Sequence, residues 1–451
     1  MPIKVINGAQ DDLAAALVGL RRRLQSEIVS ERSQKKTLAV FGAALTPAQV
    51  VKRIIADVRA EGDPALVRYT QALDGVALPP SRFRVSREEI RAARASVEPA
   101  LIASLECAIA NVRAFQTHIK PRAPRPWKSG AQTVAIRQLP LQRVAVYVPR
   151  GAAAYPSCVI MSAVPAQVAG VKEVVVLTPP EPDGTVAPAV LAACSLLKID
   201  EIYRLNAPAG IAALAYGTGA IEPVQKIVGP GNLFVTLAKK EVFGEVGIDI
   251  LAGPSEILVI ADETARPDFV AADMLSQAEH APGCAIVLSP SEEIIARTRH
   301  ELELQLSGLA TEAAARFSLK EYGLAGVTRS IEEAVELANQ FAPEHLELCT
   351  TDAAKLLKSV RNAGAVFLGP YTPEPVGDYI AGPSHVLPTS GAARFLSGLS
   401  VRDFLRTMSV IAYDEAALAA VAPDVVRLAE SEGLCAHARS VLLRFETKRR
   451  R

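Results

Sequence analysis

The alternation of short β-branched runs with helical patterns constrains the fold of this chain more than any other feature. Runs rich in valine, isoleucine and leucine occur at residues 144–148, 173–177, 201–205, 226–228, 257–260, 285–288 and 365–368, with helical spacing of apolar residues between many of them. Continuous apolar runs are typical of strands buried on both faces, and alternation with helices predicts parallel crossover connections. The sequence therefore predicts an α/β fold with doubly wound parallel sheets.

The segments at the two ends lack this alternation. Residues 11–120 show a helical pattern almost throughout, and the proline-rich segment 121–127 indicates an extended crossing. Beyond Val401 the pattern is again helical, from residue 414 to about residue 443, without strand signals. A chain of 451 residues exceeds the usual size of one hydrophobic core. We therefore expect a helical lead-in, two sheets and a separate helical tail.

The composition excludes several classes of partner. Lys and Arg number 49 against 48 Asp and Glu, so the chain has no general attraction for nucleic acid or an anionic membrane. The terminal basic run 448–451 is interpreted as a solvated end. The six cysteines lack CxxC spacing, and this absence is typical of reduced core thiols. No apolar run is long enough to span a bilayer. We expect a cytoplasmic protein with neither nucleic acid nor membrane as a partner.

A first candidate metal site is the pair Gln277 and His280. Pro267 suits the first turn of a helix whose apolar face reaches Leu275, so both polar residues are expected on its last turn, facing the same way. A helix C-terminus favours a cation, and an amide oxygen with an imidazole nitrogen can bind zinc. Taken alone, the pair is better explained as solvated surface or a capping histidine.

Further candidates come from the other histidines. Of the six, His280, His345, His385 and His437 lie among Gly, Pro, Asp and Glu residues. The Gly- and Pro-rich segment 377–388, which carries Asp378 and His385, is too long for a simple connection and is typical of functional loops. Glu344 and His345 follow a predicted helix at 331–341 and suit acid–base chemistry. Neighbours on an extended segment point to opposite faces, so a helix end followed by a surface strand explains this pair equally well.

Two glycine-rich turns are candidates for approaching a cofactor. The first, residues 149–157, follows a predicted strand, and the second, residues 229–232, precedes a predicted helix starting near Leu233. Neither matches the GxGxxG pattern of dinucleotide-binding turns. From the residues alone, a dinucleotide remains an open alternative.

Together these segments resemble one family, the zinc-dependent histidinol dehydrogenases of histidine biosynthesis. The matching motifs occur in the family's order and span most of the chain: 147–149, 154–157, 212–217, 229–232, 252–256, 276–280, 343–347 and 377–389. The resemblance implies oxidation of L-histidinol to L-histidine through L-histidinal, with two NAD. It also implies two Rossmann-like domains, one inserted in the other, and small helical pieces at both chain ends.

The resemblance carries over residue by residue. It makes Gln277, His280, Asp378 and the partner subunit's His437 the ligands of one zinc ion per subunit, and Glu344 and His345 the acid–base pair. It places the substrate among Ser255, Gln277, His280, His345, Asp378, His385, Glu432 and His437, and NAD beside Tyr147 and Asn232. The implied domains are a helical piece at 1–40, a metal-bearing domain at 41–146 and 255–399, a cofactor domain at 147–254, and a helical tail at 400–451. The terminal elements would be exchanged within a homodimer.

One segment departs from the family. Where the family has Gly-Gly-Ala-Gln, this chain has Asn206-Ala207-Pro208-Ala209, so Ala209 replaces a glutamine expected to contact NAD, and Arg150 replaces a usual glycine. Losing one hydrogen bond costs roughly 0.5–1.5 kcal/mol, about tenfold in affinity at most. Two alternatives follow: a paralogue that oxidises another small polar alcohol, amino or sulfonated, and a zinc hydrolase that needs no nicotinamide.

Overall fold

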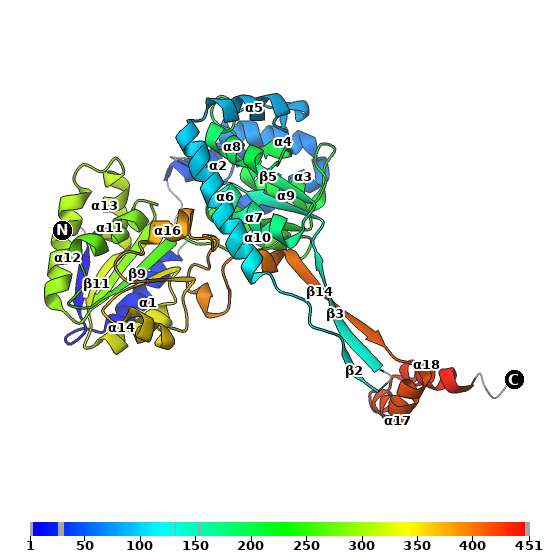
Figure 1. Cartoon of the computed structure of the whole chain (residues 1–451). Coiled ribbons are helices and arrows are strands. Elements are labelled where there is room, and N and C mark those ends of the chain that lie inside the picture. Colours follow the sequence, from blue (N-terminus) through cyan, green and yellow to red (C-terminus); the bar gives the residue numbers. More distant parts are fainter. Residues whose placement is uncertain (1–2, 26–30, 131, 152–153, 447–451) are drawn as a thin grey trace. The chain divides into compact units, whose positions relative to one another are not determined.

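The computed structural model describes residues 3–25, 31–130, 132–151 and 154–446 (Figure 1). The chain divides into two compact units, one formed by Met1–Lys120 with Leu141–Phe404 and the other by Pro121–Pro140 with Leu405–Arg451. Residues 152 and 153 of the first glycine-rich turn, and the basic run 448–451, lie outside the described residues. Each unit is considered by itself.

The first unit contains a five-stranded parallel sheet in the order β6-β5-β4-β7-β8. Its strands are β4 (Arg143–Tyr147), β5 (Glu173–Thr178), β6 (Ile202–Arg204), β7 (Lys226–Val228) and β8 (Gly247–Ile248). Side chains such as Ala145 and Leu177 pack with those of α3, α4, α9 and α10 in one apolar cluster. Because neighbouring strand residues point to opposite faces, this cluster covers one face of the sheet.

Helices supply most of the remainder of this part of the unit. They are α2 (Glu31–Phe41), α3 (Pro47–Glu61), α4 (Asp63–Tyr69), α5 (Arg87–Ser96), α6 (Pro99–Ile119), α7 (Pro156–Ala169), α8 (Pro188–Leu196), α9 (Ala207–Tyr216) and α10 (Leu233–Val242), with short helical turns at Thr70–Asp74 and Pro80–Arg82. Helix α6 packs against α7, and α7 packs against α8. The helical lead-in predicted before residue 120 is thus confirmed.

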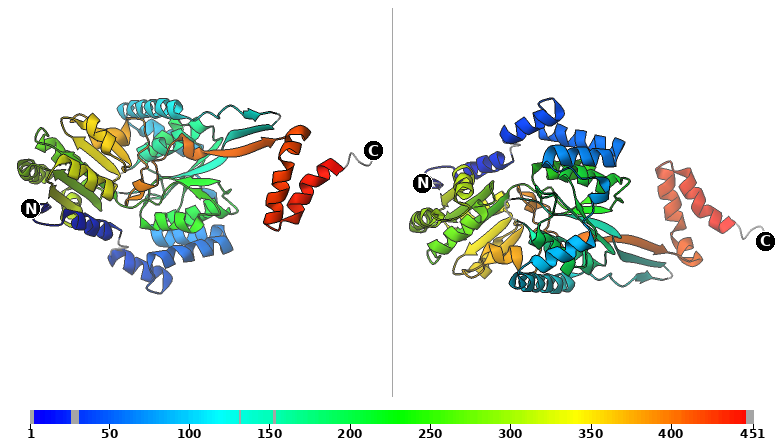
Figure 2. Two further views of the ribbon diagram at one scale, coloured as in Figure 1. Left: turned by 90° about the horizontal axis from the view of Figure 1, so that it is seen from below. Right: turned by 90° about the horizontal axis from the view of Figure 1, so that it is seen from above.

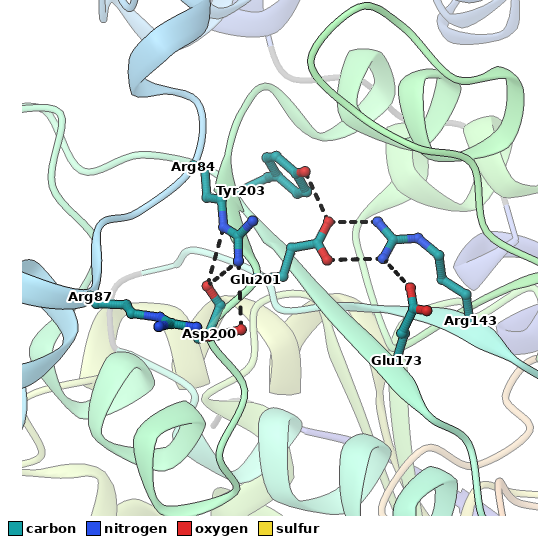
Figure 3. Close-up of polar contacts among 7 residues, drawn as sticks. All are labelled: Arg84, Arg87, Arg143, Glu173, Asp200, Glu201 and Tyr203. Atoms are coloured by element: carbon teal, nitrogen blue, oxygen red, sulfur yellow. Dashed lines mark hydrogen bonds and ion pairs between the residues drawn. The ribbon is translucent and has the colours of Figure 1, made fainter.

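A ladder of ionic contacts crosses the amino ends of β4, β5 and β6 (Figure 3). The Arg143 guanidinium lies 2.8 Å from Glu173 Oε2 and 2.5 Å from Glu201 Oε1. Beside it, Asp200 pairs with Arg84 and Arg87, which precede and begin α5. These contacts fasten the start of α5 to the sheet.

A second sheet of the first unit has six parallel strands in the order β1-β11-β10-β9-β12-β13. They are β1 (Lys4–Asn7), β11 (Gly323–Val327), β10 (Gly283–Ser289), β9 (Ser255–Ala261), β12 (His345–Cys349) and β13 (Ala365–Leu368). Val259 packs with α11 (Pro267–Ala278), α12 (Glu292–Leu306) and α13 (Glu312–Tyr322), whereas its neighbour Leu258 packs with α1 (Leu13–Leu24) and α14 (Ile331–Phe341). The two groups of helices are seen on either side of the sheet in Figures 1 and 2. Helices therefore cover both faces, as a doubly wound sheet requires.

Short elements follow β12 and β13. They are α15 (Ala353–Leu356), α16 (Glu374–Tyr379) and single helical turns at Leu357–Ser359, Ala392–Arg394 and Val401–Phe404. The last three residues of α16 belong to the Gly- and Pro-rich segment 377–388, which the sequence predicts to be a loop. Asp378 accordingly lies on a short helix, and His385 lies in the loop after it.

The second unit combines an antiparallel sheet with two helices. The sheet order is β14-β3-β2, with β2 (Trp127–Ser129), β3 (Gln132–Pro140) and β14 (Leu405–Ala412), and the helices are α17 (Glu415–Ser431) and α18 (Cys435–Glu446). The prediction of no strand beyond Val401 is wrong for β14. Seven of its eight residues are exposed within the chain, so their sequence shows no buried face, and pairing with β3 defines the strand.

Two further expectations concern the environment of the chain. All six cysteines are free thiols, and Cys158, Cys194, Cys284 and Cys349 are buried. In the described ranges no single helix is long and apolar enough to cross a bilayer, and only the pair α5 and α6, bent by 110°, passes by length and composition.

Candidate active site at the amino edge of the six-stranded sheet

The buried imidazole of His345 stands at the first residue of β12. Its Nδ1 lies 3.1 Å from the backbone oxygen of Glu256 on the neighbouring strand β9, so the Nδ1–H donates there and Nε2 carries the lone pair. Nε2 lies 3.7 Å from Glu374 Oε1 and 3.8 Å from Asp378 Oδ1. Burial lowers the pKa of His345 to about 4, opposed by Asp378, so the ring is neutral near pH 7. The site thus presents an unprotonated nitrogen, which suits a general base.

The carboxyl group of Glu344 lies beside this ring. Its Oε2 accepts the backbone N–H of Glu256 at 3.0 Å and lies 3.8 Å from His345 Nδ1. Burial raises the pKa of Glu344 well above its usual range. The concern that these adjacent residues face opposite sides does not apply, because Glu344 precedes β12 and follows Ala342, whose φ of 51° bends the chain. Both side chains therefore meet at one residue, Glu256.

Acidic side chains from α16 line the other side of His345. Ser276 Oγ donates to Glu374 Oε2 at 3.3 Å, and the backbone N–H of Glu374 donates to Glu347 Oε1 at 2.9 Å. Burial, reinforced by the Asp378 carboxylate, raises the pKa of Glu374 to about 9. One ligand atom each of His345, Glu374 and Asp378 lies within 4.8 Å of the other two, a spacing able to hold a metal ion. Crowded buried carboxyl groups favour a cation there.

Gln277 lies on the last turn of α11, next to Ser276, which contacts Glu374. Its side chain is fully buried, and in the described part of the chain neither amide atom has a hydrogen-bond partner. A buried amide without a partner is costly, and its oxygen is free to bind a metal. The placement predicted for His280 is wrong, because α11 ends at Ala278 and His280 is exposed beyond it. Gly283 lies so close to the Gln277 carbonyl that an added Cβ would be 1.9 Å away, which shows how sharply the chain turns back.

The remaining predicted residues fall into two groups. Ser255 begins β9, and His385 Nδ1 lies 3.2 Å from the Asp378 carbonyl while its buried Nε2 has no partner among the described residues. Glu432 and His437 belong to the second unit, where Glu432 caps α17 and His437 lies exposed in α18. Most of the predicted site residues therefore belong to the first unit, and their roles, like those of Glu432 and His437, stay predictions.

Two acidic residues of this site were not singled out from the sequence. Glu256 lies in the matching motif 252–256 but receives no role from the resemblance, and Glu374 lies outside every matching motif. A signal for Glu374 existed, because it lies between two prolines and four residues before Asp378, a spacing that places both on one side of a helix. Nothing in the local pattern showed that Glu256 would contact both Glu344 and His345.

The predicted cofactor residues lie at the carboxyl ends of β4 and β7. These strands are adjacent, but the chain leaves β4 toward β5 on the other side, so they mark the switch point where such sheets bind ligands. Tyr147 ends β4 and is buried, and Asn232 caps α10 by accepting the backbone N–H of Phe234 at 3.0 Å and of Val235 at 3.2 Å. Gly229 has a φ of 118°, and a Cβ there would lie 2.3 Å from the Tyr147 carbonyl, so only glycine fits.

The departing segment 206–209 forms the start of α9. Asn206 caps this helix by accepting the backbone N–H of Ala209 at 3.4 Å, and its own amide donates to Asp74 at 3.0 Å. Ala209 is fully buried. A longer side chain at this position would therefore have to displace its neighbours.

The doubly wound fold, the switch-point turns and the buried imidazole with its carboxyl groups define an α/β enzyme of the dehydrogenase class. The chain belongs to the histidinol dehydrogenase family, whose model matches residues 43–445. The histidinol dehydrogenase of Rhodopirellula baltica is 47% identical over 444 residues, covering 97% of this chain and 96% of that protein. That of Moorella thermoacetica is 50% identical and covers 93% of this chain and 98% of its own.

A solved structure agrees with this assignment. The crystal structure of histidinol dehydrogenase from Elizabethkingia anophelis is 33% identical, covers 99% of both chains and has a TM-score of 0.88. The prediction of the family and of its α/β fold is confirmed.

Proposed function

We propose that this chain oxidises L-histidinol to L-histidine through L-histidinal, in two hydride transfers to NAD. Within the histidinol dehydrogenase family, the observation that carries the proposal is the neutral His345, whose Nε2 faces Asp378 and Glu374 while Glu344 lies 3.8 Å from its Nδ1. An alcohol oxidation followed by an aldehyde oxidation requires two proton acceptors, and the imidazole of His345 and the carboxyl group of Glu344 can supply them.

A zinc ion would be held by Gln277, Asp378 and His280 of one chain and by the partner subunit's His437. The unpartnered amide of Gln277 fits such an ion. Of the proposed ligands, Asp378 belongs to the cluster with His345 and Glu374, whose buried carboxyl group favours a cation nearby. When bound, zinc would supply positive charge that anchors the imidazole and amine of the substrate. We propose one ion per subunit in a cytoplasmic homodimer, in keeping with the biosynthetic family. The exchange of terminal elements is proposed for the C-terminal helices, because β1 and α1 pack on the sheet of their own chain.

NAD would bind at the switch point of the five-stranded sheet. Tyr147 and Asn232 would border it, with Ala209 in place of the family's glutamine. The support is the position of the two glycine-containing turns at the carboxyl ends of β4 and β7, where open α/β sheets place their ligands.

The protein's own residues divide the proton transfers. His345 Nε2 accepts the hydroxyl proton as hydride leaves the alcohol carbon, while its Nδ1–H stays on the Glu256 carbonyl. In the second half, ionised Glu344 accepts a proton from the water that adds to the aldehyde. His345, having released its first proton to solvent between the two halves, then takes the hydroxyl proton of the resulting hydrate as the second hydride departs. Ser255, His385 and Glu432 would hold the substrate around these groups.

The deciding experiment measures substrate-dependent NADH formation with L-histidinol beside other amino and sulfonated alcohols. We expect two NADH per L-histidinol and little turnover of the others. Turnover of another alcohol alone would favour the paralogue, and ester or amide cleavage without NAD would favour the zinc hydrolase. Relatives 47–50% identical over nearly the whole chain favour L-histidinol.

A further inference from the structure

Arg21, on the N-terminal helix α1, forms an ion pair with the fully buried Glu256. One guanidinium nitrogen contacts Glu256 Oε1, and the other donates to the backbone oxygen of Phe341. The guanidinium also stacks 3.8 Å above the Phe341 ring. The Arg21 side chain is 13% exposed and that of Glu256 is 0% exposed, so the pair links the surface of α1 to the interior of the sheet.

Glu256 is also the residue on which both proposed reacting side chains rest. Its backbone N–H donates to Glu344 at 3.0 Å, and its backbone oxygen accepts from His345 at 3.1 Å. The Glu256 carboxylate accepts a second hydrogen bond, from the backbone N–H of Ser390 at 3.0 Å. Its two peptide groups and its carboxylate thus occupy one buried network that includes Arg21.

We propose that Arg21 is a positioning residue for the reaction, acting through Glu256 on the orientation of His345 and Glu344; this rests on the function proposed above. A buried carboxylate that loses its cation must take up a proton or move toward water. Either change shifts Glu256 on β9, and with it the backbone N–H that contacts Glu344 and the backbone oxygen that contacts His345. Misplacing a reacting group by about 1 Å can cost on the order of 10²-fold in rate.

The location of Arg21 makes this inference testable by chemical rescue. Its side chain lines a cavity of about 280 Å³ between α1 and α14, together with Arg22, Leu337, Phe341 and Arg394. Within the described residues the cavity is open to solvent, because its lining residues Val18, Arg22 and Gln25 are exposed. A small guanidinium ion can therefore enter the space that Arg21→Ala leaves.

The primary test compares Arg21→Ala with Arg22→Ala in the zinc-loaded full chain, with L-histidinol and NAD. We expect kcat of Arg21→Ala to fall about 10- to 100-fold while KM for NAD changes little, because the glycine-rich turns at 149–157 and 229–232 belong to the other sheet. Arg22→Ala, on the same helix and cavity, should stay within about twofold of the wild type. Ethylguanidinium should restore part of the lost kcat of Arg21→Ala. It should leave kcat of Arg22→Ala and of the wild type unchanged. A normal kcat for Arg21→Ala would overturn the inference.

A double-mutant cycle tests the route through Glu256. If Arg21 acts by pairing with Glu256, then Arg21→Ala combined with Glu256→Gln should lose no more kcat than the worse single variant. The double variant should also melt at a higher temperature than Arg21→Ala, since it holds no unpaired buried carboxylate. Multiplying losses in kcat would mean that Arg21 acts elsewhere, against the inference. If Arg21→Ala does not fold, Arg21→Met replaces it in the cycle, because it keeps the apolar stem over Phe341.

A parallel variant separates this inference from the proposed function. His345→Asn should abolish most activity in the same assay. If it retains the wild-type kcat, the acid–base assignment fails whatever Arg21 does. If it is inactive while Arg21→Ala is normal, only the inference about Arg21 is lost.

Discussion

His345 owes its proposed reactivity to where its two nitrogens lie. The contact of Nδ1 with the Glu256 carbonyl leaves Nε2 without a proton, and burial keeps the pKa of the ring near 4. Glu344 has the opposite shift, because burial favours the protonated form of a carboxyl group. Burial thus acts differently on the two adjacent residues. His345 is a base at neutral pH, whereas Glu344 becomes a base only when it ionises.

Glu344→Gln should therefore slow oxidation of L-histidinal more than oxidation of L-histidinol, by about 10²–10⁴-fold for loss of a general base. Because the pKa of Glu344 is raised, its ionised fraction grows as pH increases above neutral, so wild-type aldehyde oxidation should rise with pH. The variant should lack that rise. Steady-state rates with each substrate across the pH range provide the measurement. Intact aldehyde oxidation with lost alcohol oxidation would reverse the assigned roles.

At the scale of elements, the sequence predicted the strands that contain continuous apolar runs. It did not predict the buried strand β12, the glycine-containing strand β11 or the exposed strand β14. β4, β5, β9 and β10 carry continuous apolar runs because helices cover both faces of the two parallel sheets. β12 is fully buried as well, but His345 and Glu347 interrupt its pattern, and β11 is rich in glycine. β14 has no buried face within its own chain and so left no pattern to read.

The candidate site was also predictable only in part, because local patterns mark single residues but not the contacts between distant segments. Local patterns singled out Gln277, Glu344, His345, Asp378 and His385 as candidates, and the resemblance gave them roles. The structure brings Glu344, His345 and Asp378 together at the amino ends of strands β9 and β12. General rules for α/β sheets point instead to the carboxyl ends, where the cofactor turns of the other sheet lie. Contacts between distant segments, such as Glu256 with Arg21, depend on tertiary packing that no local pattern records.

The ladder at the amino ends of β4, β5 and β6 should contribute measurably to stability. Arg143→Ala removes a guanidinium that is 10% exposed and leaves Glu201 partly buried without it, so the free energy of unfolding should fall by roughly 2–3 kcal/mol, somewhat below the range for fully buried pairs. Arg87→Ala, in the same ladder but 76% exposed, should cost about 0–1 kcal/mol. Urea unfolding of both variants compares them; equal losses would show that burial does not set the contribution.

At the scale of the whole molecule, the proposed metal site rests on a fold built from strands and helices that have their own apolar cores. Prolonged chelation should therefore abolish activity while circular dichroism stays native, and the melting temperature should drop because buried carboxyl groups lose their cation. Zinc added back should restore both. Full activity in a sample shown by elemental analysis to lack metal would end the zinc proposal.

The proposed exchange of terminal elements makes a prediction about mixed dimers. If each zinc is bound by Gln277, His280 and Asp378 of one chain and by the partner subunit's His437, then neither a Gln277→Ala nor a His437→Ala homodimer has an intact site. Refolding equal amounts of the two variants together pairs them at random, so about half of the dimers are mixed, and in each mixed dimer one site carries both lesions and the other carries none. Activity should recover to about a quarter of the wild type.

If His437 served its own chain, every mixed site would keep one lesion and mixing would restore nothing. If His437 were only a helix residue of α18, His437→Ala alone would remain active. Recovery on mixing, with both parents inactive, is the outcome that a shared site requires.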